Sequence, residues 1–333
     1  MCIFGPVPSR RLGSSLGINN IPYKICTYTC AYCQIGPTLR LELERKRYSD
    51  PEKIASSVKK RLLRLAEKGE KVDYITIVPD GEPTLDTALG ELLTELRKTS
   101  IPVAVITNSS LIWESQVREA LMLADWVSLK IDAISEDIWR SVDRPHPALK
   151  HDEILEGMKI LAADFTGKLC TETMLVRDLN DVPEELEKIA DFISNYLNPY
   201  TAYISVPTRP PAASWVLPPK EEAVTAAYAI YKKKGLTVET LTGYEGNEFV
   251  ITDNPAEEIL NITAVHPMRS DAIEEVLRRW EADEQIIEDM VDEGKIKRVE
   301  YEGNIYYVRV MGDQKEKKGA LADGIGSQPR CDR

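Results

Sequence analysis

Three cysteines set close together are the residues best suited to chemistry. Cys26, Cys30 and Cys33 stand in the stretch ICTYTCAYCQIG, separated by three and then two residues. Three thiolates suit zinc or an iron–sulfur cluster, and structural zinc usually takes a fourth Cys or His at similarly short range. No such residue is there, because the histidines of the chain are at positions 146, 151 and 266. A cluster held by three protein ligands leaves one iron open to an outside molecule.

The remaining cysteines do not extend this group. Cys2, Cys170 and Cys331 are scattered along the chain. Six cysteines in a chain this long do not make a disulfide framework, and a disulfide within the trio would leave the third thiol unpaired. A metal is therefore the favoured interpretation, with structural zinc or inert core thiols as the alternatives.

A second candidate lies where an apolar run ends. The run YITIVP leads directly into Asp80-Gly81-Glu82-Pro83-Thr84. Ligands bind at the carboxyl ends of parallel strands, which makes this turn a candidate binding element. The alternative is a plain turn in which Pro83 begins a helix.

The cysteine spacing, with Tyr32 just before the last cysteine, resembles the radical S-adenosylmethionine (SAM) superfamily. The resemblance implies that Cys26, Cys30 and Cys33 hold a [4Fe–4S] cluster, whose open iron binds the amino and carboxylate groups of SAM. It also implies that Tyr32 is one of the cofactor-binding residues and that Gly81 and Glu82 receive the SAM amino group. An external donor of the flavodoxin or ferredoxin type would reduce the cluster, and cleavage of SAM would give a 5′-deoxyadenosyl radical.

More narrowly, the stretches VPSRRLGSSLGINN and GEPTLD resemble the branch of Fe–S oxidoreductases related to the tRNA wyosine-base synthase. Those enzymes generally carry a further cluster or an accessory cysteine set. Only Cys2, Cys170 and Cys331 are left here for that purpose. This departure argues against the wyosine reaction itself.

Polar residues at the ends of later apolar runs complete the expected SAM site. Similar positions in the family bind the ribose, carboxylate and adenine of SAM, and here they are Asn108, Asp132, Glu172 and Val176. The alternative roles are a cap or core hydrogen bond for Asn108 and Asp132, and plain core packing for Val176. A carboxylate within an apolar strand is costly unless it is paired or faces a cavity, and for Glu172 we favour the cavity.

Three basic residues are candidates for substrate binding. Arg10 and Arg11 precede the first expected strand, and Lys130 ends a later one. We expect them to reach an anionic substrate near the cluster. For the arginine pair, the alternative is a solvated surface position on a mobile terminus.

The elements that must position these residues alternate along the chain. Short apolar runs separated by stretches of helical periodicity predict right-handed crossovers and a parallel sheet. Six such units are fewer than the eight of a closed barrel, so a partial (βα)6 barrel and an open doubly wound sheet both fit, and the resemblance favours the barrel. The expected strands lie near residue 15 and at 74–78, 103–107, 126–131, 169–176 and 202–206, and Asp50 and Asp181 are expected helix starts.

The pattern changes after Gly246. Three helical stretches, at 255–264, 270–281 and 284–293, precede an alternating run that turns at Glu302-Gly303-Asn304. Three helices and a hairpin predict a winged-helix domain. We therefore expect a barrel domain over residues 1–250, a winged helix over 255–310 and a disordered tail over 311–333.

Charge is unevenly distributed along the 333 residues. The chain has 42 basic and 54 acidic side chains, a net charge of −12. Residues 1–68 hold 13 basic and 5 acidic side chains, whereas residues 255–310 hold 7 and 14. No run approaches the length of a membrane span, and the N-terminus lacks the apolar core of a secretory signal, so we expect a cytoplasmic protein without membrane contact.

These features leave three functions open. The first expectation is a radical enzyme acting on an RNA base, splayed into the barrel with basic residues on its phosphates. The second is an enzyme that modifies a peptide or protein held by the winged helix. The third is a redox-sensing Fe–S regulator that binds DNA, but its expected recognition helix, EQIIEDMVDE at 284–293, has five acidic and no basic residues. That charge argues against DNA as a partner.

Overall fold

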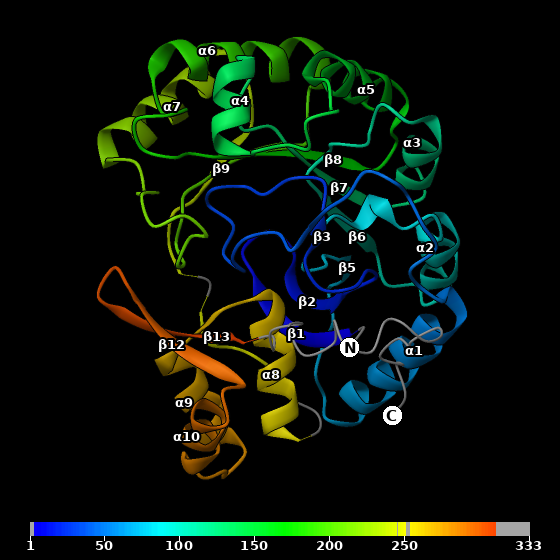
Figure 1. The fold of residues 1–333 in the computed structure, drawn as a ribbon. Helices are drawn as coiled ribbons and strands as arrows, with labels where there is room; N and C mark the ends of the chain where they lie inside the picture. Colours follow the sequence, from blue (N-terminus) through cyan, green and yellow to red (C-terminus); the bar gives the residue numbers. More distant parts are fainter. Residues whose placement is uncertain (1–2, 245, 251–253, 311–333) are drawn as a thin grey trace, which may run out of the picture.

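One curled parallel sheet organises the protein (Figure 1). The computed structural model describes residues 3–244, 246–250 and 254–310. The sheet has the order β1-β2-β5-β6-β7-β8-β9-β10, and β1 alone runs antiparallel to its neighbour. Its strands are β1 (Ile3–Ser9), β2 (Gly13–Ile18), β5 (Tyr74–Ile77), β6 (Val103–Thr107), β7 (Trp126–Lys130), β8 (Lys168–Met174), β9 (Thr201–Ser205) and β10 (Val238–Leu241). The expected α/β fold with a partial barrel is confirmed.

All six predicted strands are present, and two further strands extend the sheet at its edges. The first edge strand, β1, contains Pro6 and Pro8, which lack the N–H that a central strand needs. At the other edge, β10 has two exposed polar residues, Glu239 and Thr240, at its centre. Both therefore lack the long apolar run by which the central strands were recognised.

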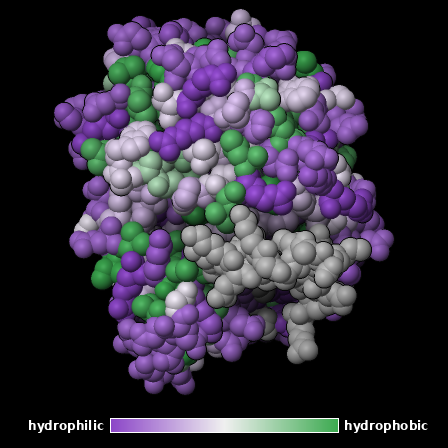
Figure 2. Space-filling model, viewed as in Figure 1, coloured by the Kyte–Doolittle hydropathy of each residue, from purple (hydrophilic) through white to green (hydrophobic). Residues whose placement is uncertain are grey.

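Helices cover the outer face of this sheet (Figure 1). Their outward sides are polar, as Figure 2 shows over the upper helices, while their apolar sides pack on the strands. They are α1 (Pro51–Glu67), α2 (Leu89–Arg97), α3 (Ser115–Leu121), α4 (Glu136–Val142), α5 (His151–Asp164), α6 (Pro183–Phe192) and α7 (Glu221–Lys233), with a 3₁₀ turn η1 (Pro83–Leu85) and a π turn η2 (Ile193–Leu197). No helix among the described residues is long and apolar enough to cross a membrane.

Of the two predicted helix starts, one is correct. Asp50 caps α1, where its carboxylate accepts a hydrogen bond from the backbone N–H of Lys53 at 3.2 Å. The prediction for Asp181 is wrong, because Pro183 takes the first helical position of α6 and Val182 is the N-cap. Asp181 therefore lies one residue too early to be the cap.

The C-terminal part is a second, smaller unit, which we call the C-terminal unit (residues 254–310). Its three helices and hairpin lie where they were expected, joined by a short strand that completes a three-stranded sheet of order β11-β13-β12. Glu302 and Gly303 have φ of 47° and 71°, as a tight two-residue hairpin turn requires. The elements are α8 (Pro255–Val265), β11 (Met268–Arg269), α9 (Ser270–Arg279), α10 (Gln285–Asp292), β12 (Ile296–Tyr301) and β13 (Asn304–Arg309).

This unit packs against the N-terminal edge of the sheet. Phe4 and Val7 of β1 belong to the same buried cluster as Ile259, Ile262 and the other apolar residues of the unit. Arg61 of α1 forms an ion pair with Glu258 of α8, and only 6% and 1% of these residues are exposed. The two parts of the chain that were predicted as separate domains, 1–250 and 255–310, therefore share a hydrophobic core, and a buried ion pair joins them. The predicted tail, 311–333, lies outside the described residues.

Candidate active site

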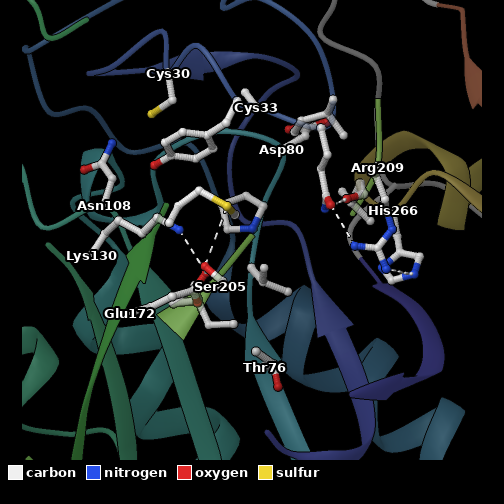
Figure 3. A pocket seen from close by; sticks show the side chains of 18 of the residues that line it. Cys30, Cys33, Thr76, Asp80, Asn108, Lys130, Glu172, Ser205, Arg209 and His266 are labelled. Atoms are coloured by element: carbon white, nitrogen blue, oxygen red, sulfur yellow. Dashed lines mark hydrogen bonds and ion pairs between the residues drawn. The ribbon is translucent and has the colours of Figure 1, made fainter. Parts of the chain in front are cut away.

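A cavity of about 350 Å³ opens at the carboxyl ends of the parallel strands (Figure 3). Its wall combines the cysteine loop, the turn after β1, the ends of β5 to β9, and two residues of the C-terminal unit. Eleven of the thirteen predicted site residues line it: Arg10, Arg11, Cys26, Cys30, Tyr32, Cys33, Gly81, Glu82, Asn108, Lys130 and Glu172. The topology thus brings together residues more than 160 positions apart in the sequence.

The cysteine loop (residues 24–42) has little regular structure, yet its backbone is firmly attached to the barrel. Only β3 (Ile25–Cys26) and β4 (Arg40–Leu41) pair within it. The backbone N–H of Thr29 donates to the carbonyl of Arg144 at 3.1 Å, and that of Ala31 donates to Val142 at 2.8 Å. These hydrogen bonds to the end of α4 fix the direction of the loop without a helix or a long strand.

Gly81 holds the loop against the end of β5. A Cβ atom at this position would overlap the carbonyl oxygen of Ile25 and lie 2.7 Å from Cδ1 of Ile21. The adjacent N–H of Glu82 donates to that same carbonyl at 3.1 Å. Only glycine permits this close approach of two backbone segments. The Gly-Glu turn therefore lies directly beside the first cysteine.

The Glu82 carboxylate is buried and fully engaged with its surroundings. It accepts hydrogen bonds from the N–H of Thr84 at 3.0 Å, the hydroxyl of Thr107 at 2.6 Å and the N–H of Asn108 at 2.8 Å. Burial raises its pKa, and these hydrogen bonds oppose the shift. Glu82 thus caps η1, as the plain-turn alternative expects, and also ties β5 to β6 at the cavity wall.

Each of the three thiols has its own polar neighbour. The sulfur of Cys26 lies 3.5 Å from Asn108 Nδ2, and that of Cys33 lies 3.5 Å from Lys24 Nζ. The Cys30 thiol donates to a carboxylate oxygen of Asp143, also at 3.5 Å. Burial raises the pKa of Cys26 to about 12 and places that of Cys30 well above its ordinary value. Binding of a metal by these sulfurs would therefore release protons.

The donor set fits an iron–sulfur cluster. Three soft sulfur ligands face one cavity, and two of them have an N–H donor beside them, as cluster sulfurs commonly do. Among the described residues no group of three or more His, Cys, Asp or Glu side chains, the three cysteines included, is arranged to hold a single metal ion, so the fit to a cluster rests on the chemistry of the sulfur donors and on their shared cavity. Cys170 is buried among Trp126 and other core residues, and Cys2 and Cys331 lie outside the described residues.

Tyr32 connects the cysteine loop to buried carboxyls behind the wall. Its hydroxyl donates to Asp132 and, at 3.2 Å, to Asp143, while the ammonium of Lys130 lies 5.0 Å from its ring centre. Burial, together with the charge of Asp132, raises the pKa of both Tyr32 and Asp143 well above their ordinary values. Asp132 also accepts from the N–H of Met174 at 2.7 Å. The Asp132 carboxylate therefore makes its hydrogen bonds behind the cavity wall and does not face the cavity.

Glu172 faces the cavity within a network of polar side chains (Figure 3). Lys130 lies beside it in the register of β7 and β8, and its ammonium is 2.9 Å from the carboxylate. The hydroxyl of Ser205 donates to the same oxygen at 3.0 Å, and Arg11 pairs with the other oxygen. Both conditions expected for a carboxylate in this strand, pairing and a cavity, are met.

Two predicted SAM contacts are not part of the wall. Asp132 lies behind Tyr32, and Val176 is fully buried in a small cluster with Ala31, Val142 and Val216. Their contact with SAM stays a prediction. For Val176 the geometry matches the core alternative.

Four wall residues with basic, acidic or imidazole side chains were missed from the sequence: Lys24, Asp80, Arg209 and His266. Asp80 is 3% exposed, one of its oxygens has no hydrogen-bond partner, and burial raises its pKa to about 6. Arg209 donates to Gln34 at 2.8 Å and lies 2.9 Å from Nε2 of His266. Lys24 and Asp80 adjoin the recognised motifs and could have been found there. Arg209 and His266 carry no local signal, because Arg209 stands in the irregular loop after β9 and only the packing of the C-terminal unit brings His266 to the cavity.

Comparison with known proteins gives a family and several relatives. A family model described as the radical SAM superfamily matches residues 20–193. A UPF0026 protein of Methanocaldococcus jannaschii is 45% identical over 92% of this chain and 95% of its own length.

Two solved structures resemble the fold. One is a radical SAM methyltransferase from Sphaerobacter thermophilus, 15% identical over 68% of this chain and 66% of that one, with a TM-score of 0.48. The other is TYW1 with a lysine-pyruvate adduct bound, 13% identical over 90% of this chain and 81% of that one, with a TM-score of 0.44.

Proposed function

This chain belongs to the radical SAM superfamily, and from that premise we propose that it cleaves SAM reductively and uses the resulting 5′-deoxyadenosyl radical to remove a hydrogen atom from a substrate in this cavity. The observation that carries the proposal is the common position of the three thiols and the Gly81-Glu82 turn on one cavity wall. Members of this family bind a [4Fe–4S] cluster and SAM.

Each part of the wall has a distinct task in this proposal. Cys26, Cys30 and Cys33 would hold the cluster, which when reduced supplies one electron to the sulfonium of SAM. Gly81 keeps the cysteine loop beside the strand end, and Glu82 fixes the turn that would receive the SAM amino group. Asn108 and Glu172 are proposed contacts to the rest of SAM, together with the more distant Asp132 and Val176.

Substrate binding is assigned to the cationic side of the cavity. Arg10, Arg11, Lys24, Lys130 and Arg209 line it, against three acidic residues. This excess of positive charge supports a substrate with anionic groups. An RNA base is our first candidate, because phosphates would meet these cations and residues 1–68 are the positive part of an acidic chain. The resemblance of VPSRRLGSSLGINN and GEPTLD to the branch related to the tRNA wyosine-base synthase also supports RNA as the substrate.

A peptide substrate is the second candidate, favoured by the C-terminal unit. We interpret its three helices and hairpin as a winged helix. The hydroxyls of Tyr301 and Tyr306 donate to the carbonyls of Pro207 and Thr208, in a loop of the cavity wall, at 3.1 and 2.9 Å. A partner docked on this unit would therefore lie close to the cavity.

DNA binding by this unit has no electrostatic support. The exposed side chains of α10 include Glu288, Asp289 and Asp292 and no basic residue, and Figure 2 shows a strongly polar surface over α9 and α10. Phosphate contacts supply most non-specific affinity for nucleic acid. The redox-regulator alternative therefore ranks below both enzyme proposals.

The test is anaerobic reconstitution of the protein with iron and sulfide, reduction in the presence of SAM, and detection of 5′-deoxyadenosine. Formation of this product supports the proposed reaction, and its absence from a fully loaded, reduced protein contradicts it. The substrate class is then decided by comparing modified nucleosides and modified peptides from cells with and without the gene. A missing nucleoside favours RNA, and a missing peptide modification favours the second candidate.

A further inference from the structure

We propose that Lys24 is a positioning residue that raises the reduction potential of the cluster, through an N–H···S hydrogen bond to Cys33 and a buried positive charge. The inference rests on the proposed function, because it presumes that Cys33 is a cluster ligand. It concerns a residue that neither the cysteine motif nor the Gly-Glu turn includes.

The position of the Lys24 side chain is strongly determined. The residue is 2% exposed, although lysine is almost never fully buried in proteins. Its ammonium donates to the carbonyl of Gly36 and lies 3.5 Å from the sulfur of Cys33. Its φ of 55° is in the left-handed region, which is uncommon for a residue other than glycine.

The backbone of Lys24 fixes it at the root of the cysteine loop. Its carbonyl accepts hydrogen bonds from the N–H groups of Leu39 and Arg40 at 3.1 and 3.2 Å. The two ends of the cysteine loop therefore meet at Lys24. Because the backbone is fixed here and the ammonium contacts Gly36 and Cys33, the side chain cannot turn toward solvent while the loop keeps its shape.

The expected effect on the cluster follows from charge. Reduction adds one electron, and a nearby positive charge stabilises the more negative state. Because the ammonium is buried, this attraction is screened less than it would be at the surface. The charge of Lys24 also acts on the buried carboxyl of Asp80, whose pKa it lowers against the larger effect of burial, and when ionised Asp80 offsets part of the effect on the cluster.

Comparison with Asn108 separates the effect of the hydrogen bond on the reduction potential from the effect of the charge. Its amide nitrogen lies 3.5 Å from the sulfur of Cys26, the same distance as Lys24 Nζ from Cys33. The amide offers an N–H to sulfur but no charge. Loss of Asn108 should therefore lower the potential less than loss of Lys24 does.

The experiment measures the midpoint potential of the reconstituted cluster by a dye-mediated titration followed by electron paramagnetic resonance. Lys24→Met should shift the midpoint to a more negative value, Lys24→Gln should give a smaller shift, and Lys24→Arg should stay near the wild type. Lys53→Met is the matched control, because the Lys53 side chain is 71% exposed at the start of α1 and should leave the midpoint unchanged.

Iron and sulfide content is determined for every variant, so that only loaded clusters are compared. If Lys24→Met does not retain the cluster, Lys24→Gln supplies the decisive midpoint. An unchanged midpoint in a fully loaded variant without the charge overturns the role of Lys24 and leaves the proposed function intact. Absence of a cluster or of SAM cleavage in the wild type would instead overturn the proposed function.

Discussion

The cysteine loop and the C-terminal unit both contribute to the cavity wall, but they are built in opposite ways. The loop has only two-residue strands, and its shape comes from backbone hydrogen bonds to the barrel and from the contact at Gly81. The C-terminal unit has regular helices, its own sheet and a core, and it reaches the cavity only through Val265 and His266.

Accurate placement of functional side chains here depends on how the backbone of each region is fixed. An irregular loop can aim several side chains in one direction, provided that a rigid scaffold fixes its backbone at many points. A regular unit supplies surface and stability but few side chains at any one point. Changes at the loop contacts should therefore damage the chemistry, whereas changes at the unit's contacts should damage stability.

The largest effect is expected from Gly81→Ala. The added Cβ would overlap the Ile25 carbonyl, so the loop must move away from β5 and carry Cys26 with it. We expect the reconstituted protein to lose most of its iron, as measured by iron and sulfide analysis. Gly243→Ala is the control, because a Cβ there meets no atom within 4 Å. Full iron content in Gly81→Ala would show that the close contact is not needed to hold the cysteines.

The second prediction concerns the attachment of the C-terminal unit. Arg61→Met removes one charged partner of the buried Glu258 carboxylate, and loss of one partner of a buried pair typically costs about 3–5 kcal/mol. Denaturant unfolding should show this loss, while cluster content at low denaturant should stay near that of the wild type. The exposed neighbour Lys60→Met is the control. A stability equal to that of the wild type would mean that the unit is held by other contacts.

A smaller effect is expected at Glu82. Glu82→Ala should weaken SAM binding by about tenfold, or about 1.4 kcal/mol, with cluster content retained. Glu82→Gln keeps an oxygen to cap η1 and so separates the cap from the charge. Equilibrium binding of SAM to the reconstituted proteins is the measurement. If SAM affinity were the same in all three proteins, Glu82 would be only a capping residue.

The sequence predicted the sheet well, because its central strands are continuous apolar runs whose burial on both faces leaves a clear pattern. It predicted the cysteines and the Gly-Glu turn because their function requires a fixed local spacing. It did not predict Arg61, which has the sequence context of a solvated helix face but is buried against α8. Nor did it predict Arg209 and His266, whose proximity depends on contacts between distant segments. Local patterns do not encode such tertiary neighbours.

The most direct test of the central claim is the electron paramagnetic resonance spectrum of the reduced, reconstituted protein with and without SAM. Three cysteine ligands leave one iron open, so SAM should bind there and change the spectrum. We predict a clear change in the wild type and loss of the cluster signal in Cys30→Ala, whereas Cys170→Ala should behave as the wild type. A spectrum that SAM does not alter, or a full signal in Cys30→Ala, would contradict the assignment of the three cysteines to an open-site cluster.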